Sequence, residues 1–277
     1  MQELLTSLSR TQAIALVIGL AIFLSWESLQ PFFGFYGRAS RERFRHGALN
    51  LVLGALNSLA VTLAFVSAWL WAAEWAYANE FGLLNLIDGS ILLPTWLRVV
   101  FAVLLLDAWT YTWHRLNHRS SFLWRFHRVH HSDRNMDVTT ATRFHIGEIV
   151  LSSALRLPII LLFGVYVWEL VLYETVMFAV VQFHHANIAV PEPLDRLLRI
   201  FVVTPNMHKV HHSRVQVETD SNYSALLSIW DRIGRSFRMR KPAEIQFGLD
   251  EFSSEDSASF ATILKMPIGS ASKDDGS

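Results

Sequence analysis

A chain of 277 residues of which 52% are hydrophobic and only 17% are charged is too apolar for an ordinary soluble domain or a disordered segment. The formal net charge is zero, so no global electrostatic field favours nucleic acid as a partner. The chain has no cysteine, which excludes disulfides, iron–sulfur clusters, cysteine nucleophiles and thiolate metal ligands. Any bound metal must therefore use imidazole, carboxylate or backbone oxygen.

Three apolar runs predict a transmembrane region over residues 1–113. The first covers residues 12–26 and extends to Phe33, without the basic start or the small-residue cleavage site of a signal peptide. The second, Gly47 to Ala78, exceeds the roughly 20 residues of one span, so we expect it to tilt or to project from the bilayer. The third runs from about Trp96 to His114.

Charged residues in the loops predict the orientation of these helices. The loop at 38–45 carries four arginines, whereas residues 79–95 contain Glu80 and Asp88 but no lysine or arginine. Because basic loops face the cytoplasm, we expect the 38–45 loop and the end of the third helix to be cytoplasmic.

Residues 114–245 are predicted to form one catalytic region that includes a membrane hairpin at about 146–183. Pro158 and Gly164 can divide this apolar stretch. Histidines flank both of its ends, and a hairpin brings both ends to one side of the membrane, whereas a single crossing separates them. The following segment is basic, with amphipathic pieces at 194–203 and 222–233, and residues 246–277 form a polar tail that we expect to be partly disordered. The predicted fold is therefore all-α: an integral-membrane bundle of about four to five membrane-embedded helices with a cytosolic helical cap.

Eleven of the twelve histidines lie between residues 114 and 212. Helix positions i, i+3 and i+4 share a face, so this spacing predicts three imidazole-rich faces. Burying so many imidazoles without a metal would be costly in desolvation. A metal takes roughly three to five protein ligands, so eight to ten histidines suit two metals. The zinc-peptidase motif His-Glu-x-x-His and the Glu-x-x-His pairs of soluble di-iron bundles are absent, and an all-histidine dinuclear site beside a membrane points to iron and dioxygen.

Asp107 and Tyr111 share a helix face with His114 and His118. A carboxylate within an apolar helix is costly and usually has a function. Asp107 either accepts the free N–H of a ligand histidine or forms a hydrogen bond to another helix, and the sequence leaves both open.

These residues make the chain similar to the fatty acid hydroxylase/sterol desaturase superfamily of integral-membrane, non-haem di-iron enzymes. The resemblance covers about residues 96–240. The motifs that carry it are Asp107-Ala-Trp-Thr-Tyr111-Thr-Trp-His114-Arg-Leu-Asn-His118, Phe126-His127-Arg-Val-His130-His131-Ser132, Arg143-Phe-His145, His185-Ala-Asn187, Thr204-Pro-Asn206-Met-His208-Lys-Val-His211-His212-Ser213 and the Asn222-Tyr…Trp230-Asp231 block.

The resemblance implies a set of metal ligands. His145 is followed by Ile146 where the family usually has proline, and His184 is an extra residue beside the matching His185, so both are less secure candidates. Asp107, Tyr111 and Asn187 are candidates for positioning the ligands. The implied ligands are His114, His118, His127, His130, His131, His185, His208, His211 and His212, with His145 and His184 as further candidates.

The chemistry implied by the resemblance is oxidation of an unactivated C–H bond of a lipid by two iron ions and O2, giving hydroxylation or desaturation. Electrons would come from an external donor such as a ferredoxin, a cytochrome b5-like protein or a reductase. Cleavage of an alkyl ether or aldehyde by the same centre is an alternative. A membrane metal-binding or transport protein is a third, but it would place histidines through the bilayer rather than at one face. The C-terminus lacks an endoplasmic-reticulum retrieval signal, which favours a bacterial inner membrane, with the histidine site on the cytoplasmic side.

Overall fold

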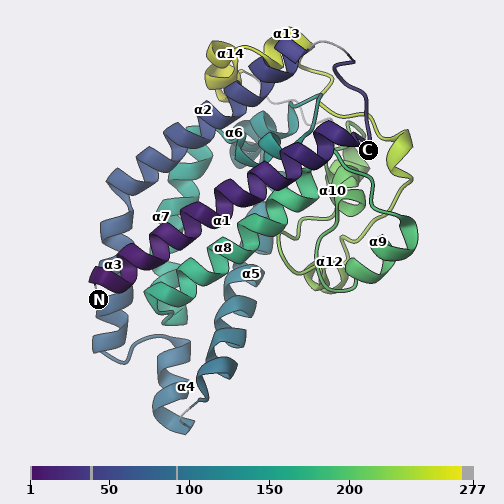
Figure 1. Ribbon diagram of the computed structural model, residues 1–277. Coiled ribbons are helices and arrows are strands. Elements are labelled where there is room, and N and C mark those ends of the chain that lie inside the picture. The colour runs from purple at the N-terminus through teal and green to yellow at the C-terminus, as the bar shows by residue number, and fades with distance from the viewer. Residues whose placement is uncertain (1, 38–39, 92, 270–277) are drawn as a thin grey trace.

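The computed structural model describes residues 2–37, 40–91 and 93–269, and the part it describes contains helices and no strands. Long helices form a bundle, and shorter helices form a cap at one end of it (Figure 1). The bundle consists of α1 (Gln2–Leu29), α2 (Ser40–Ala64), α3 (Val66–Ala78), α4 (Leu83–Ile91), α5 (Thr95–Arg119), α7 (Ile146–Phe163) and α8 (Val167–His185). The cap consists of α6 (Ser121–His131), η1 (Val138–Thr142), α9 (Glu192–Leu198), α10 (Pro205–His211), α11 (Gln216–Thr219), α12 (Ile229–Ile233), η2 (Pro242–Glu244), α13 (Ser254–Ser257), α14 (Phe260–Lys265) and η3 (Met266–Ile268).

Among the residues that the structure describes, three helices are long and apolar enough to cross a membrane, within Arg10–Leu29, Arg41–Ala64 and Ile146–Phe163. Helices α5 and α8 have 25 and 19 residues and run beside them, but they carry buried charged side chains such as Asp107 and Glu169. The predicted all-helical membrane bundle with a histidine-rich cap is thereby confirmed.

The long apolar stretch from Gly47 to Ala78 is divided into α2 and α3 at Phe65. Hydrogen bonds from Phe65 N to Val61 O (2.9 Å) and from Trp69 N to Phe65 O (2.9 Å) continue through the break. Helix α3 therefore follows α2 directly, without a loop, and the excess length of the stretch forms a second helix.

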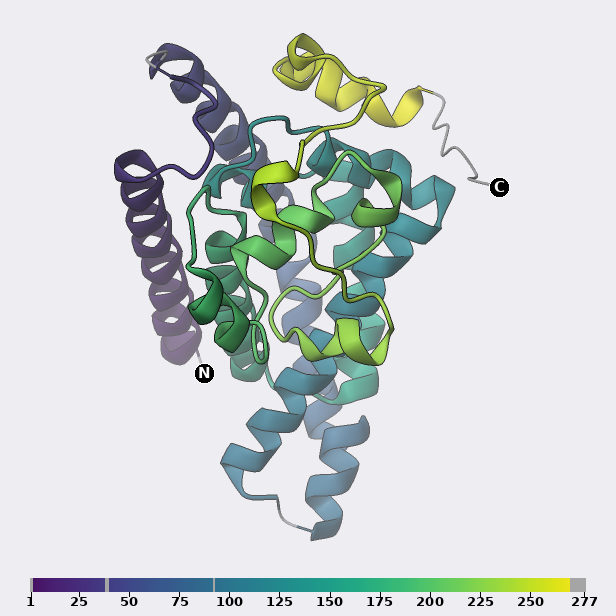
Figure 2. The same ribbon diagram turned by 90° about the vertical axis from the view of Figure 1, so that its right-hand side faces the viewer.

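Helices α7 and α8 are joined by a tight turn at Gly164. The start of α7 and the end of α8 both lie at the cap (Figure 2). Gly164 has φ +66°, a left-handed conformation that ends α7 and favours glycine. A Cβ atom there would lie 2.8 Å from Phe81 O, just before α4, and 2.9 Å from Asn85 Nδ2 within it, so this close approach also requires glycine. Pro158 lies inside α7 without ending it, in contrast to the expectation that it would help to divide the stretch.

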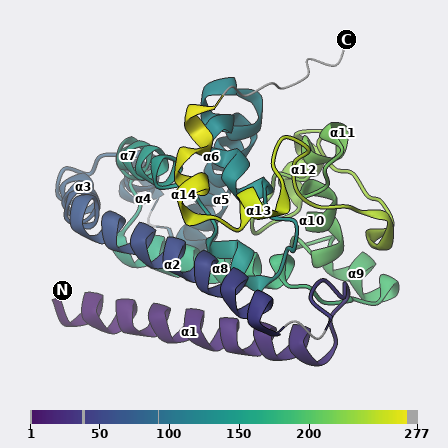
Figure 3. The same cartoon turned by 90° about the horizontal axis from the view of Figure 1, so that it is seen from above.

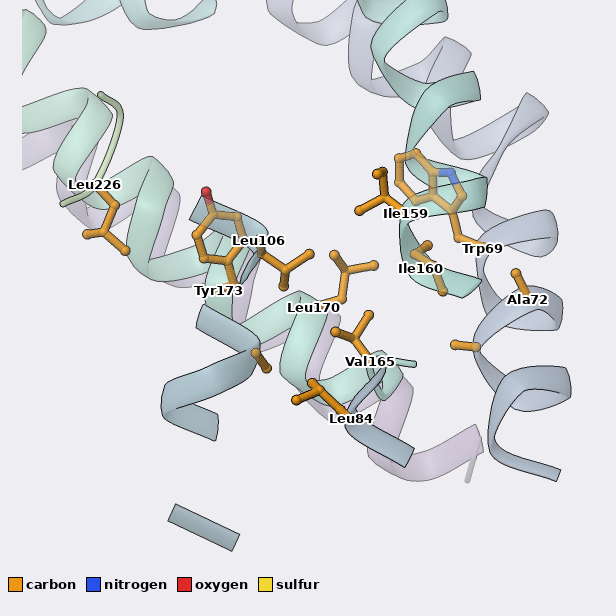
Figure 4. Packing of buried hydrophobic residues seen from close by; sticks show 12 residues of the cluster. Trp69, Ala72, Leu84, Leu106, Ile159, Ile160, Val165, Leu170, Tyr173 and Leu226 are labelled. Carbon is orange, nitrogen blue, oxygen red and sulfur yellow. The ribbon is translucent and has the colours of Figure 1, made fainter. Parts of the chain in front are cut away.

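The apolar core lies between α3, α5, α7 and α8 (Figure 4). Trp69, Leu106, Ile160 and Tyr173 pack there and are at most 9% exposed. The Trp69 indole donates to the Ser153 carbonyl (3.0 Å), which satisfies its buried N–H. This core fixes the positions of α5 and α8, which both lead into the cap.

A buried ion pair closes the bundle at the end far from the cap. Arg98 donates to Glu169 (2.9 Å), to Asn85 (3.0 Å) and to the Gly164 carbonyl (2.8 Å). Removing one partner of a buried pair leaves the other charge uncompensated.

We therefore expect Arg98→Met, which keeps most of the side-chain length, to lower the free energy of unfolding by about 3–5 kcal/mol. Thermal unfolding of the detergent-solubilised protein measures this change. The exposed Arg196, which pairs with Glu192 on α9, is the control, and Arg196→Met should have a far smaller effect. Adding Glu169→Gln to Arg98→Met should recover part of the loss, and no recovery would contradict the charge argument.

The end of the described chain folds onto the cap. Ile263 of α14 and Met266 of η3 pack against Leu53 of α2 and Val129 of α6, so that α14 lies over these helices (Figure 3). Arg128 of α6 donates to Glu251 (3.2 Å) and to the Gly269 carbonyl (3.0 Å). The disorder expected for the last residues of the tail falls on 270–277, outside the described residues.

Candidate metal centre

Nine of the predicted ligands converge in the cap from α5, α6, α8 and the α10 segment, in two groups. Within each group the candidate ligand atoms lie within 4.8 Å of one another. The first histidine group comprises His114, His118, His127, His131 and His211, and the second comprises His130, His185, His208 and His212.

In the first histidine group, ring nitrogens face one another at short distances. His127 Nε2 lies 3.1 Å from His114 Nε2 and 3.2 Å from His131 Nε2. The opposite nitrogens have acceptors: His114 Nδ1 contacts Tyr223 O (2.7 Å) and His211 Nδ1 contacts Ser221 O (2.7 Å). A backbone carbonyl can only accept, so these Nδ1 atoms carry the proton and each Nε2 presents a lone pair.

Two carboxylates also accept from Nδ1 atoms of histidines in this group. His127 Nδ1 lies 2.9 Å from Glu148 Oε1, and His118 Nδ1 lies 3.3 Å from Asp220 Oδ1. Such carboxylates fix the tautomer and the ring orientation of a metal-binding histidine and increase its basicity.

The second histidine group repeats this arrangement. His185 Nε2 lies 3.1 Å from both His130 Nε2 and His208 Nε2, and His208 Nε2 lies 3.1 Å from His212 Nε2. His130 Nδ1 contacts Arg143 O (3.2 Å) and His185 Nδ1 contacts Val181 O (2.8 Å). His130 and His185 therefore also direct unprotonated nitrogens at each other.

Facing lone pairs repel each other unless a cation lies between them. Two nitrogens bound to one metal at about 2.0–2.1 Å lie roughly 2.9–3.4 Å apart for bond angles of about 90–109°. The observed separations of 3.1–3.2 Å fall within this range. The two groups thus have the donor set and the spacing of two metal sites.

Burial favours, in His130, His131, His208, His211 and His212, the neutral form that binds metals. Burial, and then the neighbouring His212, hold the pKa values of His130 and His131 well below the ordinary range. Burial likewise lowers the pKa values of His208 and His212, and it lowers the pKa of His211 to about 3. Neutral imidazoles with free nitrogens are the usual ligands of first-row transition metals.

Adjacent residues in the sequence serve different groups. His130 belongs to the second group and His131 to the first, whereas His211 belongs to the first group and His212 to the second. Residues 114–131 supply four ligands of the first group but only His130 of the second, so this segment alone cannot complete both sites.

The two less secure ligand candidates lie outside both groups. His145 caps α7, where its Nδ1 accepts from Gly147 N (2.9 Å) and its Nε2 lies 3.3 Å from Leu264 O. His184 is buried, with its ring centroid 3.9 Å from that of His208. His145 therefore has a local structural role, whereas His184 lies against a ligand candidate.

Asp107 connects α5 to α8 and to the segment of α12, and among the described residues its hydrogen-bond donors include no histidine. It accepts from Tyr173 Oη (3.1 Å), Leu227 N (2.9 Å) and Trp230 Nε1 (2.7 Å). Of the two roles that the sequence left open, this is the hydrogen bond to another element.

Tyr111 and Asn187 also hold neighbouring backbone segments in place, those of Tyr223 and Phe33. Tyr111 Oη lies 2.9 Å from Ser236 Oγ, and its ring packs against Tyr223, whose carbonyl contacts His114. Asn187 bonds both the N–H and the carbonyl of Phe33 (2.9 Å each), and so ties the segment after α1 to the end of α8.

The sequence did not identify Glu148 and Asp220 as partners of ligands. Glu148 is an acidic residue at the start of a mainly apolar helix, and such a residue is a signal of function. Asp220 lies in a polar loop and carries no comparable signal.

A cavity of about 210 Å³ extends from the histidines into the bundle. Histidines of both groups, His127 and His130, form one end of it. Its wall is apolar for the most part and comes from α5, α7 and α8, with Trp109, Trp113, Phe144, Ile149, Met177, Phe178 and Val181 among the lining residues. The cavity can hold an apolar chain beside both histidine groups.

Residues 99–236 match the family described as fatty acid hydroxylase, and this segment contains every residue of both histidine groups. The chain belongs to the fatty acid hydroxylase family through residues 99–236. The predicted superfamily is thereby confirmed.

Curated relatives support this membership. The chain is 31% identical over 162 residues to ornithine lipid hydroxylase OlsE of Rhizobium tropici, covering 56% of this chain and 46% of the relative. It is 31% identical over 157 residues to alkylglycerol monooxygenase of Homo sapiens (56% and 33%) and 32% identical over 141 residues to that of Danio rerio (49% and 29%). The chain thus matches less than half the length of each relative. No solved structure matches the chain significantly.

Proposed function

We propose that this protein is a membrane-bound di-iron oxygenase that hydroxylates or desaturates a lipid at an unactivated C–H position. The observation that carries the proposal is the pair of histidine groups at the end of an apolar cavity. Two iron ions bound there would activate O2 and supply an oxidant strong enough to attack such a bond. Family membership and the names of the relatives support the same reaction class.

The chain's own residues would hold the ligands and the substrate. Glu148 and Asp220 keep the protons of His127 and His118 on Nδ1, which leaves Nε2 for the metal. The aromatic wall formed by Trp109 and Phe178 would exclude water and hold one carbon of the substrate near the histidines. Which bond is oxidised then depends on how deep a chain enters the cavity.

A second candidate is cleavage of an alkyl ether by the same centre. Two of the relatives above are named alkylglycerol monooxygenases, and their identity to this chain, 31% and 32%, is close to the 31% of the ornithine lipid hydroxylase. Oxidation of the carbon next to an ether oxygen is a hydroxylation, so the same arrangement of metals and cavity serves both reactions. Aldehyde cleavage belongs to the same class of alternatives, whereas metal transport is disfavoured because both histidine groups lie at one end of the bundle.

The proposal includes partners and a location. Electrons must come from an external donor such as a ferredoxin, a cytochrome b5-like protein or a reductase, and the substrate comes from the bilayer. The arginine-rich segment at 38–45 supports a cytoplasmic location of the cap, and we propose a bacterial inner membrane.

The test combines metal analysis with lipid analysis. We expect the purified protein to contain about two iron ions per chain. Cells that express it under 18O2 should accumulate a lipid that carries the label if the reaction is hydroxylation, or a fatty aldehyde if an ether is cleaved. A lipid that gains only a double bond indicates desaturation. Zinc alone in the protein, together with an unchanged lipid profile in aerobic cells, would contradict the proposal.

A further inference from the structure

The cap carries an exposed apolar surface that the metal centre does not use. Six large apolar side chains on it are 41–67% exposed. We call them the α9–α12 patch: Leu194, Leu197, Ile200, Phe201, Ile229 and Ile233. Large apolar side chains exposed together on neighbouring segments mark a site of interaction with a protein or a membrane.

The two segments that form the patch are held together as one unit. Ser228 N donates to Phe201 O (3.1 Å), and Ser228 Oγ donates to Arg199 O (2.7 Å). Arg232 also donates to Arg199 O (2.8 Å), and Val202 pairs with Leu227 in a β-bridge. The patch is therefore a preformed surface of the fold.

Hydrogen bonds to Asp107 of α5 set the position of this unit along the axis of the bundle. It accepts from Leu227 N and Trp230 Nε1, which flank the start of α12. Asp107 precedes His114 by seven residues of α5, about 10 Å of helix in the direction away from the cap. Figure 1 accordingly shows α9 and α12 below α10, on the side of the cap that faces α4, and Figure 2 agrees. The patch thus lies on the bundle side of the histidine groups.

From this placement we propose that the α9–α12 patch is inserted into the membrane leaflet next to the cap. Apolar side chains at that level meet acyl chains, and the neighbouring Arg196 and Arg235, both exposed, can reach lipid phosphates. Ser224 and Ala225, which precede α12 by a few residues, line the cavity. The segment that leads into α12 therefore also forms part of the cavity wall, and lipids of this leaflet are the nearest source of substrate for the cavity. The insertion itself rests on the membrane fold, and only this last step rests on the proposed function.

The absence of cysteine makes a direct test possible, because a single introduced cysteine can be labelled selectively. Phe201→Cys labels the patch. Val217→Cys is the matched control: Val217 is also apolar, 55% exposed and in the cap. Val217 lies near Asp220, which contacts His118. His118 follows Asp107 by eleven residues of α5, about 16 Å of helix, so Val217 lies farther from the bundle than the patch does.

Each variant is labelled with a nitroxide and reconstituted into vesicles of phosphatidylcholine and phosphatidylglycerol. Collision of the label with O2, which partitions into lipid, is compared with collision with a water-soluble nickel chelate. We expect the ratio of O2 collisions to nickel collisions at Phe201 to exceed that at Val217 by on the order of tenfold. A tenfold difference corresponds to a free energy of about 1.4 kcal/mol for excluding the polar chelate from the lipid around the label.

Two results would overturn the proposal. Equal ratios at the two positions would place the patch in water. Shielding of Phe201 from both reagents, with line broadening that disappears on dilution with unlabelled protein, would show that a second copy of the chain covers the patch. Ile233→Cys on α12 repeats the measurement from the other segment, so a defect of one variant does not decide the outcome.

Discussion

His130→Ala and His131→Ala should each leave about one metal ion per chain and should lower product formation by at least about 100-fold. The two residues are adjacent in α6, but His130 belongs to the second histidine group and His131 to the first. Each substitution removes one proposed ligand from a different histidine group and leaves the other group complete. Metal analysis by mass spectrometry, with X-ray absorption of the remaining ion, measures the effect.

The control for these variants is His145→Asn. Asparagine can cap a helix as His145 does for α7, and His145 lies outside both histidine groups. This variant should therefore retain both ions and form product. If His130→Ala or His131→Ala retained two ions per chain, or if His145→Asn lost one, the division of ligands derived from the structure would be wrong.

The sequence was sufficient to predict the ligand faces but not their division between two sites. Helical spacing places His127, His130 and His131 on one broad side of α6. Successive residues still differ by about 100° around the axis, so His130 and His131 point in different directions. Which of them meets His185 depends on where α8 lies, and that is set by packing of the apolar core about Tyr173.

The role of Asp107 shows a second limit of the same kind. Its place in an apolar helix, on the face of His114, indicated a function but was compatible with two partners. Its observed donors include Trp230, which follows 123 residues later in the chain. A contact at that separation depends on the path of the whole cap, which local sequence patterns do not specify. The hairpin, by contrast, depends on the local signal of Gly164, and the turn forms there.

The second large effect is expected at Glu148, which the structure places against His127. Glu148→Gln keeps the shape of the side chain and one oxygen that can accept from His127 Nδ1, but it removes the negative charge that raises the basicity of the ring. Loss of such a partner weakens metal binding or activity by about 10–100-fold. We therefore expect Glu148→Gln to purify with less than the full metal content and to lose activity in the same proportion.

Reloading with metal distinguishes this mechanism from a lost ligand. Glu148→Gln retains all nine histidines, so anaerobic incubation with excess Fe2+ should restore most of its metal content and product formation. His131→Ala, which lacks a ligand of the same group as His127, should not recover. Ser152→Ala provides the structural control, since Ser152 lies four residues further along α7 and lines the same cavity. Normal metal content in Glu148→Gln, or a similar loss in Ser152→Ala, would show that the charge of Glu148 does not act on the metal through His127.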